Sequence, residues 1–225
     1  PLEGTTEDSM VQVRGVLDRH GLASKPLWIT EVGWPNNTCS YGVSRLKSAS
    51  YLVRTYALAW AHGIDQVDWY TYADGGDPTQ ACVNQEAAFG VVDSSGIAKP
   101  AYGAWATLNR LVLPLPYAGD VTTDLGLPAD GRALRFASTG HSVTVVWLAP
   151  ESLASDTGAL PSADHRVQVR TPVGVTSIVA MDGREVPAGA TFEASPYPVY
   201  LVVPAPVGIA TPLPGGLPNT SRQPG

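Results

Sequence analysis

The sequence predicts two consecutive parts of different class, an α/β part over residues 1–113 and an antiparallel all-β part over residues 132–204. Three observations indicate this division. Helical periodicity alternates with short apolar runs up to about residue 112. Proline then recurs within residues 113–116, where both patterns end. From residue 132 onward, apolar residues alternate with polar ones in short runs that turn residues separate.

The first part reads as a succession of helices and short strands. Gly63 is placed to end one helix, and Pro100 suits the first turn of the last helix. Strands that alternate with helices in this way form βα units and hence parallel sheets. Along the chain we expect a helix over 7–20, a strand over 27–32, a helix over 41–62, a strand over 67–72, a strand-like run over 89–93 and a helix over 100–112.

Glu31 is the most informative residue, because it lies at the C-terminal end of an apolar strand. Strict alternation would place Ile29 and Glu31 on one face and Val32 on the other. A buried Glu is costly unless it is paired or used in chemistry. A carboxylate at the C-terminal end of a parallel strand is where α/β barrel enzymes keep their catalytic groups. The alternative is a Glu that caps the next turn or pairs with an Arg.

The segment Trp28-Ile29-Thr30-Glu31-Val32-Gly33-Trp34-Pro35 resembles strand seven, the nucleophile strand, of clan A retaining glycoside hydrolases such as those of families 5, 39 and 17. Trp69-Tyr70-Thr71-Tyr72-Ala73-Asp74 is similar to strand eight of the family 39-like group. The run 89–93 and the following Lys99-Pro100-Ala101-Tyr102 resemble the entry into the last barrel helix. This resemblance covers residues 1–112. It implies strands seven and eight of a TIM (β/α)₈ barrel, followed by a β-sandwich, with Glu31 as the nucleophile.

The same resemblance implies that part of the machinery lies elsewhere. A retaining glycosidase needs a second carboxylate about 5–5.5 Å from the nucleophile. In clan A this acid/base follows Asn on strand four, and the sequence contains no Asn-Glu pair. We therefore expect a fragment of a longer retaining glycosidase, inactive alone, whose partner is the missing N-terminal half of the barrel. The alternative is a non-catalytic carbohydrate-associated module or a degenerate barrel. The sugar and the linkage stay open.

Three further residues are candidates for contact with a carbohydrate substrate. Trp34 could stack on a sugar or pack in the core. Tyr70 aligns with the strand-eight Trp that, in the resembled families, forms the floor of the subsite for the cleaved sugar. Asp74 could bind a sugar hydroxyl or simply make the turn at Gly75.

The two cysteines follow the two predicted barrel strands. Cys39 comes after the first strand and Cys82 after the second, so both are expected in neighbouring loops on the catalytic face. A disulfide between them is plausible, and it would indicate a secreted or extracytoplasmic protein. Two unrelated free thiols are the alternative.

The all-β part reads as an antiparallel sandwich that stabilises the barrel rather than binding sugar, and Trp147 alternates with apolar neighbours as a core residue does. We expect residues 114–131 to be a linker and residues 205–225, rich in Pro and Gly, to be a disordered tail. A net charge of −6 disfavours nucleic acid and anionic membranes as partners. The four His and two Cys show no metal-ligand spacing, so neither a metal nor another cofactor is expected.

Overall fold

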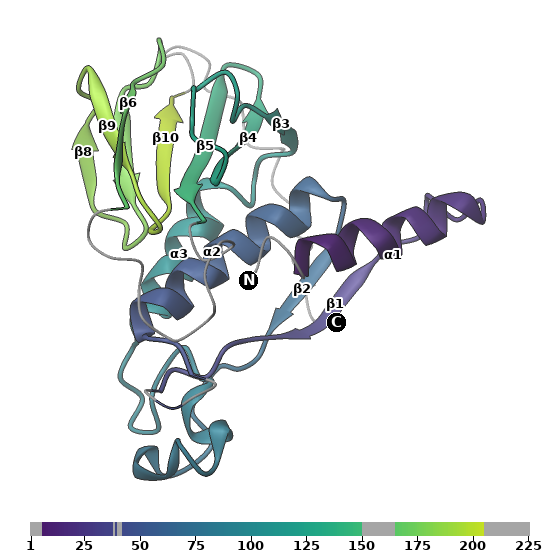
Figure 1. The fold of residues 1–225 in the computed structure, drawn as a ribbon, viewed down its shortest axis with the longest axis vertical. Helices are drawn as coiled ribbons and strands as arrows, with labels where there is room; N and C mark the ends of the chain where they lie inside the picture. The colour runs from purple at the N-terminus through teal and green to yellow at the C-terminus, as the bar shows by residue number, and fades with distance from the viewer. Residues whose placement is uncertain (1–5, 38, 40–41, 150–164, 205–225) are drawn as a thin grey trace, which may run out of the picture.

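The structure, a computed structural model, describes residues 6–37, 39, 42–149 and 165–204. Figure 1 shows the β1–β2 pair beside α1, then α2 and α3, and then the antiparallel strands. The elements are α1 (Glu7–Arg19), β1 (Trp28–Val32), α2 (Arg45–Ala61), β2 (Gln66–Trp69), the short 3₁₀ helices η2 (Pro78–Gln80) and η3 (Gln85–Ala88), α3 (Pro100–Leu111), β3 (Tyr117–Asp120), β4 (Gly131–Ser138), β5 (His141–Leu148), β6 (Val167–Arg170), β7 (Ser177–Ala180), β8 (Glu185–Pro187), β9 (Thr191–Ala194) and β10 (Val199–Val203).

The α/β part has the predicted order of helices and strands. β1 and β2 pair in parallel, with α2 as the crossover between them. Ser44 begins α2 as its N-cap, since its hydroxyl accepts a hydrogen bond from the Lys47 N–H at 3.1 Å. Gly63 follows the helix with a φ of +67°, a left-handed conformation that glycine adopts without steric cost.

The predicted strand-like run over 89–93 does not form a strand. Val92 makes isolated bridges to Ala73 and to Ala98, and no ladder extends from either of them in the described residues. Only glycine fits at position 90, because a Cβ there would be 2.3 Å from the Asp74 backbone nitrogen. The run instead packs its backbone against the segment that follows β2.

The β part is a sandwich of two antiparallel sheets. A six-stranded sheet has the order β3-β4-β5-β10-β7-β8, and β6 pairs with β9 in a second sheet. One apolar core, which includes Val146, Phe192 and Leu201, fills the space between them. β3 lies inside the range that was expected to be a linker, so the sheet begins earlier than predicted, and β8 was not predicted at all. The expected tail over 205–225 lies outside the described residues.

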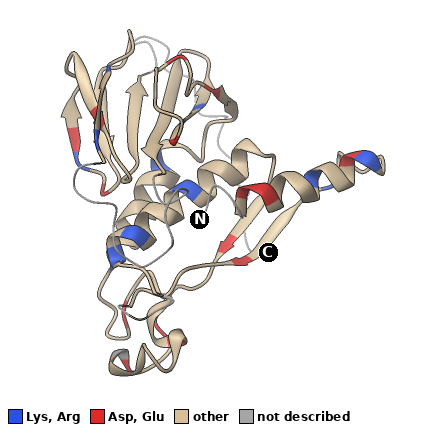
Figure 2. Cartoon of the chain, viewed as in Figure 1, with Lys and Arg blue, Asp and Glu red and all other residues tan. Residues whose placement is uncertain are grey.

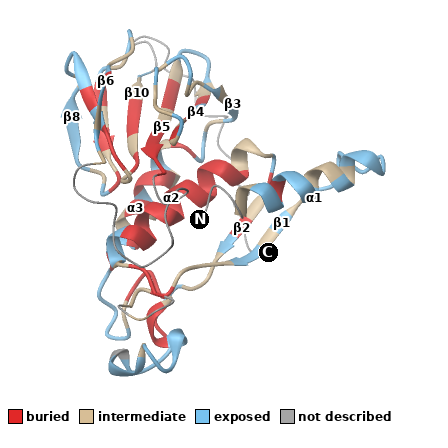
Figure 3. Cartoon of the chain, viewed as in Figure 1, coloured by how far each residue is buried: buried red, intermediate tan, exposed pale blue. Residues whose placement is uncertain are grey.

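The other face of the six-stranded sheet packs on α2 and α3. A second core joins Leu52, Tyr56 and Leu108 of these helices to Phe136 and Trp147 of the sheet. Trp147 is fully buried, which confirms its predicted core position. Figure 3 shows buried residues concentrated on α2, α3 and the central strands, whereas α1 and β1 are largely exposed. The sandwich and the βα units therefore share one hydrophobic core.

Candidate active site

A β-bulge near the end of β1 decides which way Glu31 points. Ile29 pairs with Val67, but Val32 then pairs with Trp69, so β1 carries one extra residue between these two points. Val67 and Trp69 lie two residues apart on β2 and share a face. Ile29 and Val32 therefore both face the helices, where they pack against the shared core.

Glu31 lies within this bulge, and it is exposed whereas Ile29 and Val32 pack on the core that α2 shares, so its side chain lies away from α2. The strict alternation expected from the sequence, with Ile29 and Glu31 on one side and Val32 on the other, is corrected by the bulge. Exposure agrees with the register, since Thr30 and Glu31 are exposed while Ile29 and Val32 are partly buried. In a closed barrel the face away from the helices is the interior.

Glu31 also borders the free edge of β1. In the described residues β1 has a single strand partner, β2. A cavity of about 270 Å³ runs along the other edge, lined by Glu31, Trp28 and, from α1, Met10 and Val13. The Glu31 carboxylate makes no ion pair within the part of the chain that the structure describes, so it is accessible from this side.

Tyr70 lies beside Glu31. It follows β2 directly, and its N–H donates a hydrogen bond to the Val32 carbonyl at 2.8 Å. Its phenol donates a hydrogen bond to the Glu86 carboxylate, and its ring meets Phe89 edge-on at 5.3 Å between centroids. The hydrogen bond to Glu86 raises the pKa of Tyr70, and partial burial and the negative charges of Glu86 and Glu31 raise it further.

Gly33 allows the segments after the two strands to touch. A Cβ at this position would lie 1.9 Å from the Tyr70 carbonyl oxygen and 3.0 Å from its carbon. Both atoms belong to the backbone, which cannot rotate away as a side chain can. The peptide bond between Tyr70 and Thr71 is cis.

Asp74 occupies a buried ion pair rather than an exposed position. Its carboxylate lies 2.6 Å from Lys99 Nζ and accepts the Gly90 N–H at 2.8 Å. The side chains of Asp74 and Lys99 are 3% and 2% exposed, respectively. The expected contact of Asp74 with a sugar hydroxyl is therefore not supported, and the pair instead joins the end of the β2 segment to the start of α3.

Trp34 lies in an aromatic cluster. Its ring packs edge-on against Tyr51 at 5.0 Å and at a tilt against Trp69 at 5.7 Å. It is partly buried against the core that α2 shares with the sheet. Of the two alternatives that the sequence left open, this arrangement favours core packing over sugar stacking.

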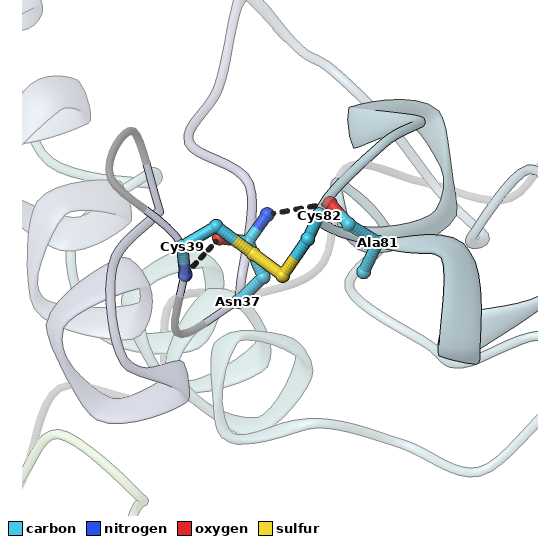
Figure 4. Close-up of a disulfide and its surroundings, with 4 residues drawn as sticks. All are labelled: Asn37, Cys39, Ala81 and Cys82. Carbon is cyan, nitrogen blue, oxygen red and sulfur yellow. Dashed lines mark hydrogen bonds between the residues drawn. A yellow bond between two sulfur atoms is a disulfide. The ribbon is translucent and has the colours of Figure 1, made fainter.

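Cys39 and Cys82 form a disulfide, with their Cα atoms 5.5 Å apart, as the sequence predicted. Figure 4 shows Asn37 beside this disulfide: its amide nitrogen donates to the Ala81 carbonyl at 3.0 Å, and its side-chain oxygen accepts the Cys39 N–H at 3.0 Å. The loop after β1 is thus cross-linked to the loop after β2. The contacts of Asn37 with Ala81 and of Glu86 with Tyr70 were not predicted, because each joins residues that are distant in sequence.

The described residues contain no group of three or more His, Cys, Asp and Glu that could hold a metal ion. In that same part of the chain, no helix has the length and apolar character needed to cross a membrane. Figure 2 shows acidic and basic residues interspersed over the elements.

Known structures reproduce this architecture. A family 39 glycoside hydrolase from Bacteroides cellulosilyticus WH2 superposes with a TM-score of 0.65 at 23% sequence identity, over 87% of this chain and 38% of its own. A family 30 endoxylanase from Clostridium papyrosolvens C71 matches with a TM-score of 0.53 at 13% identity, over 90% of this chain and 47% of its own.

The chain has the fold of part of these glycoside hydrolases. It spans less than half the length of either enzyme. Because the match covers nearly all of this chain, it includes the βα units and at least part of the antiparallel strands. Neither a protein family model nor a curated protein sequence matches the chain.

Proposed function

We propose that β1 and β2 are strands seven and eight of a (β/α)₈ barrel and that Glu31 is the nucleophile of a retaining glycoside hydrolase. The position of Glu31 carries this proposal. The carboxylate lies at the C-terminal end of a parallel strand, on the face away from α2, and is exposed. Catalytic groups of such barrels gather at the C-terminal ends of the strands. The fold shared with part of two glycoside hydrolases supports the same function.

In this reaction the Glu31 carboxylate attacks the anomeric carbon while the glycosidic bond breaks, and the acid/base carboxylate protonates the leaving oxygen. Water, deprotonated by the same acid/base group, then hydrolyses the covalent glycosyl–enzyme intermediate and releases Glu31 as a carboxylate. A carboxylate nucleophile must be ionised and accessible to the substrate, and the side chain of Glu31 is exposed. The acid/base carboxylate would lie about 5–5.5 Å away. It would come from strands beyond β1 and β2, along the free edge that Glu31 borders.

The Cys39–Cys82 disulfide supports the further proposal that the protein works outside the cytoplasm. Disulfides persist in oxidising compartments, where enzymes that act on polysaccharides also meet their substrates. The disulfide holds together the loops at the C-terminal ends of β1 and β2, so it stabilises the surface on which Glu31 lies.

The test is Glu31→Gln in the complete gene product, assayed on a panel of aryl glycosides. The isosteric amide removes the nucleophile and leaves packing unchanged, so we expect kcat to collapse while the melting temperature stays constant. Glu185→Gln, at an exposed position on β8, is the matched control and should hydrolyse normally. Normal turnover by Glu31→Gln would reject the assignment. A gene product that binds glycans but hydrolyses none would favour the non-catalytic module.

A further inference from the structure

The loop between β2 and α3 presents one exposed carboxylate, Glu86, to the candidate site. Several contacts hold its backbone. The Glu86 carbonyl accepts the Gly75 N–H at 2.7 Å, and the Asn84 side-chain oxygen accepts the Glu86 N–H at 3.2 Å as the N-cap of η3. Cys82, four residues earlier, is anchored to Cys39 by the disulfide. Both the N–H and the carbonyl of Glu86 are therefore hydrogen bonded, in a loop that the disulfide anchors.

The position of the Tyr70 ring is determined from three sides. Its backbone is hydrogen bonded to Val32, its ring meets Phe89 edge-on, and its hydroxyl donates to Glu86. The first two contacts fix the position of the ring but do not determine which acceptor the hydroxyl bonds. Glu86 supplies that acceptor, and the charges that act on the phenol in the described residues belong to Glu86 and Glu31.

We propose that Glu86 is a positioning residue of this site, which holds the Tyr70 phenol in place beside Glu31, and that the Cys39–Cys82 disulfide keeps Glu86 within reach. The hydrogen bond between Tyr70 and Glu86 does not depend on whether the protein is an enzyme. Its consequence for catalysis rests on the proposed function, because Tyr70 would border the subsite in which the sugar reacts. With its hydroxyl donating to Glu86, the phenol does not donate that hydrogen bond to the Glu31 carboxylate.

The first test observes Tyr70 directly in the 225-residue chain. Tyrosine labelled with ¹³C at Cζ gives one NMR resonance per ring, and Tyr70→Phe identifies the resonance of Tyr70. In the wild type this resonance should titrate above the ordinary tyrosine range, because the hydrogen bond and both carboxylates favour the neutral phenol. An ordinary Tyr70 titration in the folded wild type would overturn the proposal without any variant at Glu86.

Two substitutions then separate hydrogen bonding from charge. Glu86→Gln keeps an acceptor oxygen but removes the charge, whereas Glu86→Ala removes both. We expect Tyr70 to titrate at lower pH in both variants, and at the lowest pH in Glu86→Ala. Glu185→Ala is the matched control, because it deletes an exposed carboxylate on β8 and should leave the Tyr70 titration unchanged. Identical titrations in Glu86→Ala and the wild type would overturn the proposal.

The role of the disulfide is tested by replacing both cysteines with Ser. If the disulfide keeps Glu86 near Tyr70, Tyr70 should titrate at lower pH in this variant than in the wild type, as in Glu86→Ala. A Tyr70 titration that matches the wild type would show that the disulfide does not keep Glu86 in place.

The kinetic test uses the complete gene product. Loss of one positioning hydrogen bond should lower kcat/KM by about 2- to 10-fold in Glu86→Ala, and Glu86→Gln should restore part of it. An active wild type with unchanged kcat/KM in Glu86→Ala would reject the positioning role. A gene product without hydrolase activity would reject the proposed function and leave the NMR result on the contact intact.

Discussion

At the scale of single residues, the site depends on close approach between the segments that follow β1 and β2. Gly33 provides this approach, because its missing side chain leaves room for the Tyr70 carbonyl. Asp74, in the segment that follows β2, and Lys99, at the start of α3, form a buried ion pair. Such a pair is expensive to break, since removal of one partner leaves an uncompensated charge in the interior. Glu31 is exposed by comparison and has no ion pair among the described residues, as suits the nucleophile that we propose.

Gly33→Ala should destabilise the protein. The new Cβ would meet a backbone oxygen at 1.9 Å, so the segments after β1 and β2 must separate, at a cost of about 1–3 kcal/mol typical of overpacking. Gly103→Ala in α3 is the control, because its Cβ would meet nothing within 4 Å and alanine favours helix by about 0.5–1 kcal/mol. Urea denaturation measures both. Equal stability of the two variants would contradict the close approach.

At the scale of elements, α2 is the centre of the molecule. One side of it contacts β2 and the other contacts the six-stranded sheet. Tyr56 makes the first of these contacts, because its hydroxyl donates to the Val67 carbonyl at 3.0 Å. Burial raises the pKa of Tyr56 from its ordinary value of 10.0 to about 12, and the charge of Asp68 contributes in the same direction.

This shift predicts a pH dependence of stability. The unfolded chain releases the Tyr56 proton near 10.0, whereas the folded chain holds it until about 12. The stabilisation is therefore complete below pH 10 and is lost as the pH rises towards 12. Chemical denaturation should show the free energy of unfolding falling more steeply in the wild type than in Tyr56→Phe between about pH 9 and pH 11.5. Parallel slopes would show that Tyr56 is not held neutral by the fold.

The helices and most strands could be predicted from the sequence because their signal is local. Apolar periodicity identifies α2, α3, β5 and β10 without knowledge of the fold. β3 and β8 were missed because they are short edge strands with mostly exposed residues. The facing of Glu31 could not be read from alternation, because the bulge depends on how β1 pairs with β2.

The same limit applies to the site. The sequence left open whether Asp74 binds a sugar hydroxyl or makes the turn at Gly75, and it gave no sign of the ion pair because Lys99 is 25 residues away in sequence. Glu86 is 16 residues from Tyr70, and nothing in either segment indicates that they meet. The two cysteines could be paired in advance, since each follows a strand and parallel strands end at one edge of a sheet.

At the scale of the whole molecule, the arrangement is layered. The small β6–β9 sheet covers the six-stranded sheet, which packs on α2 and α3, and α2 covers the β1–β2 pair. The layers differ in how far they are buried. The central strands of the six-stranded sheet and α2 are buried, whereas Trp28 on β1 is 56% exposed. Several α1 residues, including Val13 and Val16, are also exposed. Trp28 and Val13 both line the cavity at the free edge of β1, so exposed apolar surface lies along this edge.

The 225 residues alone are therefore expected to fold around the shared core but not to hydrolyse glycosides. Without a positioned acid the leaving group is not protonated, and general acid catalysis is typically worth about 10²–10⁴-fold. The assay is hydrolysis of unactivated alkyl glycosides and oligosaccharides by the purified chain, because a good aryl leaving group departs without protonation. Turnover at the rate of ordinary glycosidases would mean that a second carboxylate within these residues serves as the acid.

The most direct measurement is to trap the glycosyl–enzyme intermediate in the complete gene product. A fluorinated aryl glycoside that is attacked quickly and released slowly leaves its sugar attached to the nucleophile, and mass spectrometry of the digested protein locates it. The proposed mechanism predicts one sugar on the peptide that contains Glu31, and products with retained anomeric configuration. A sugar attached to a different carboxylate, or hydrolysis with inverted configuration, would contradict it.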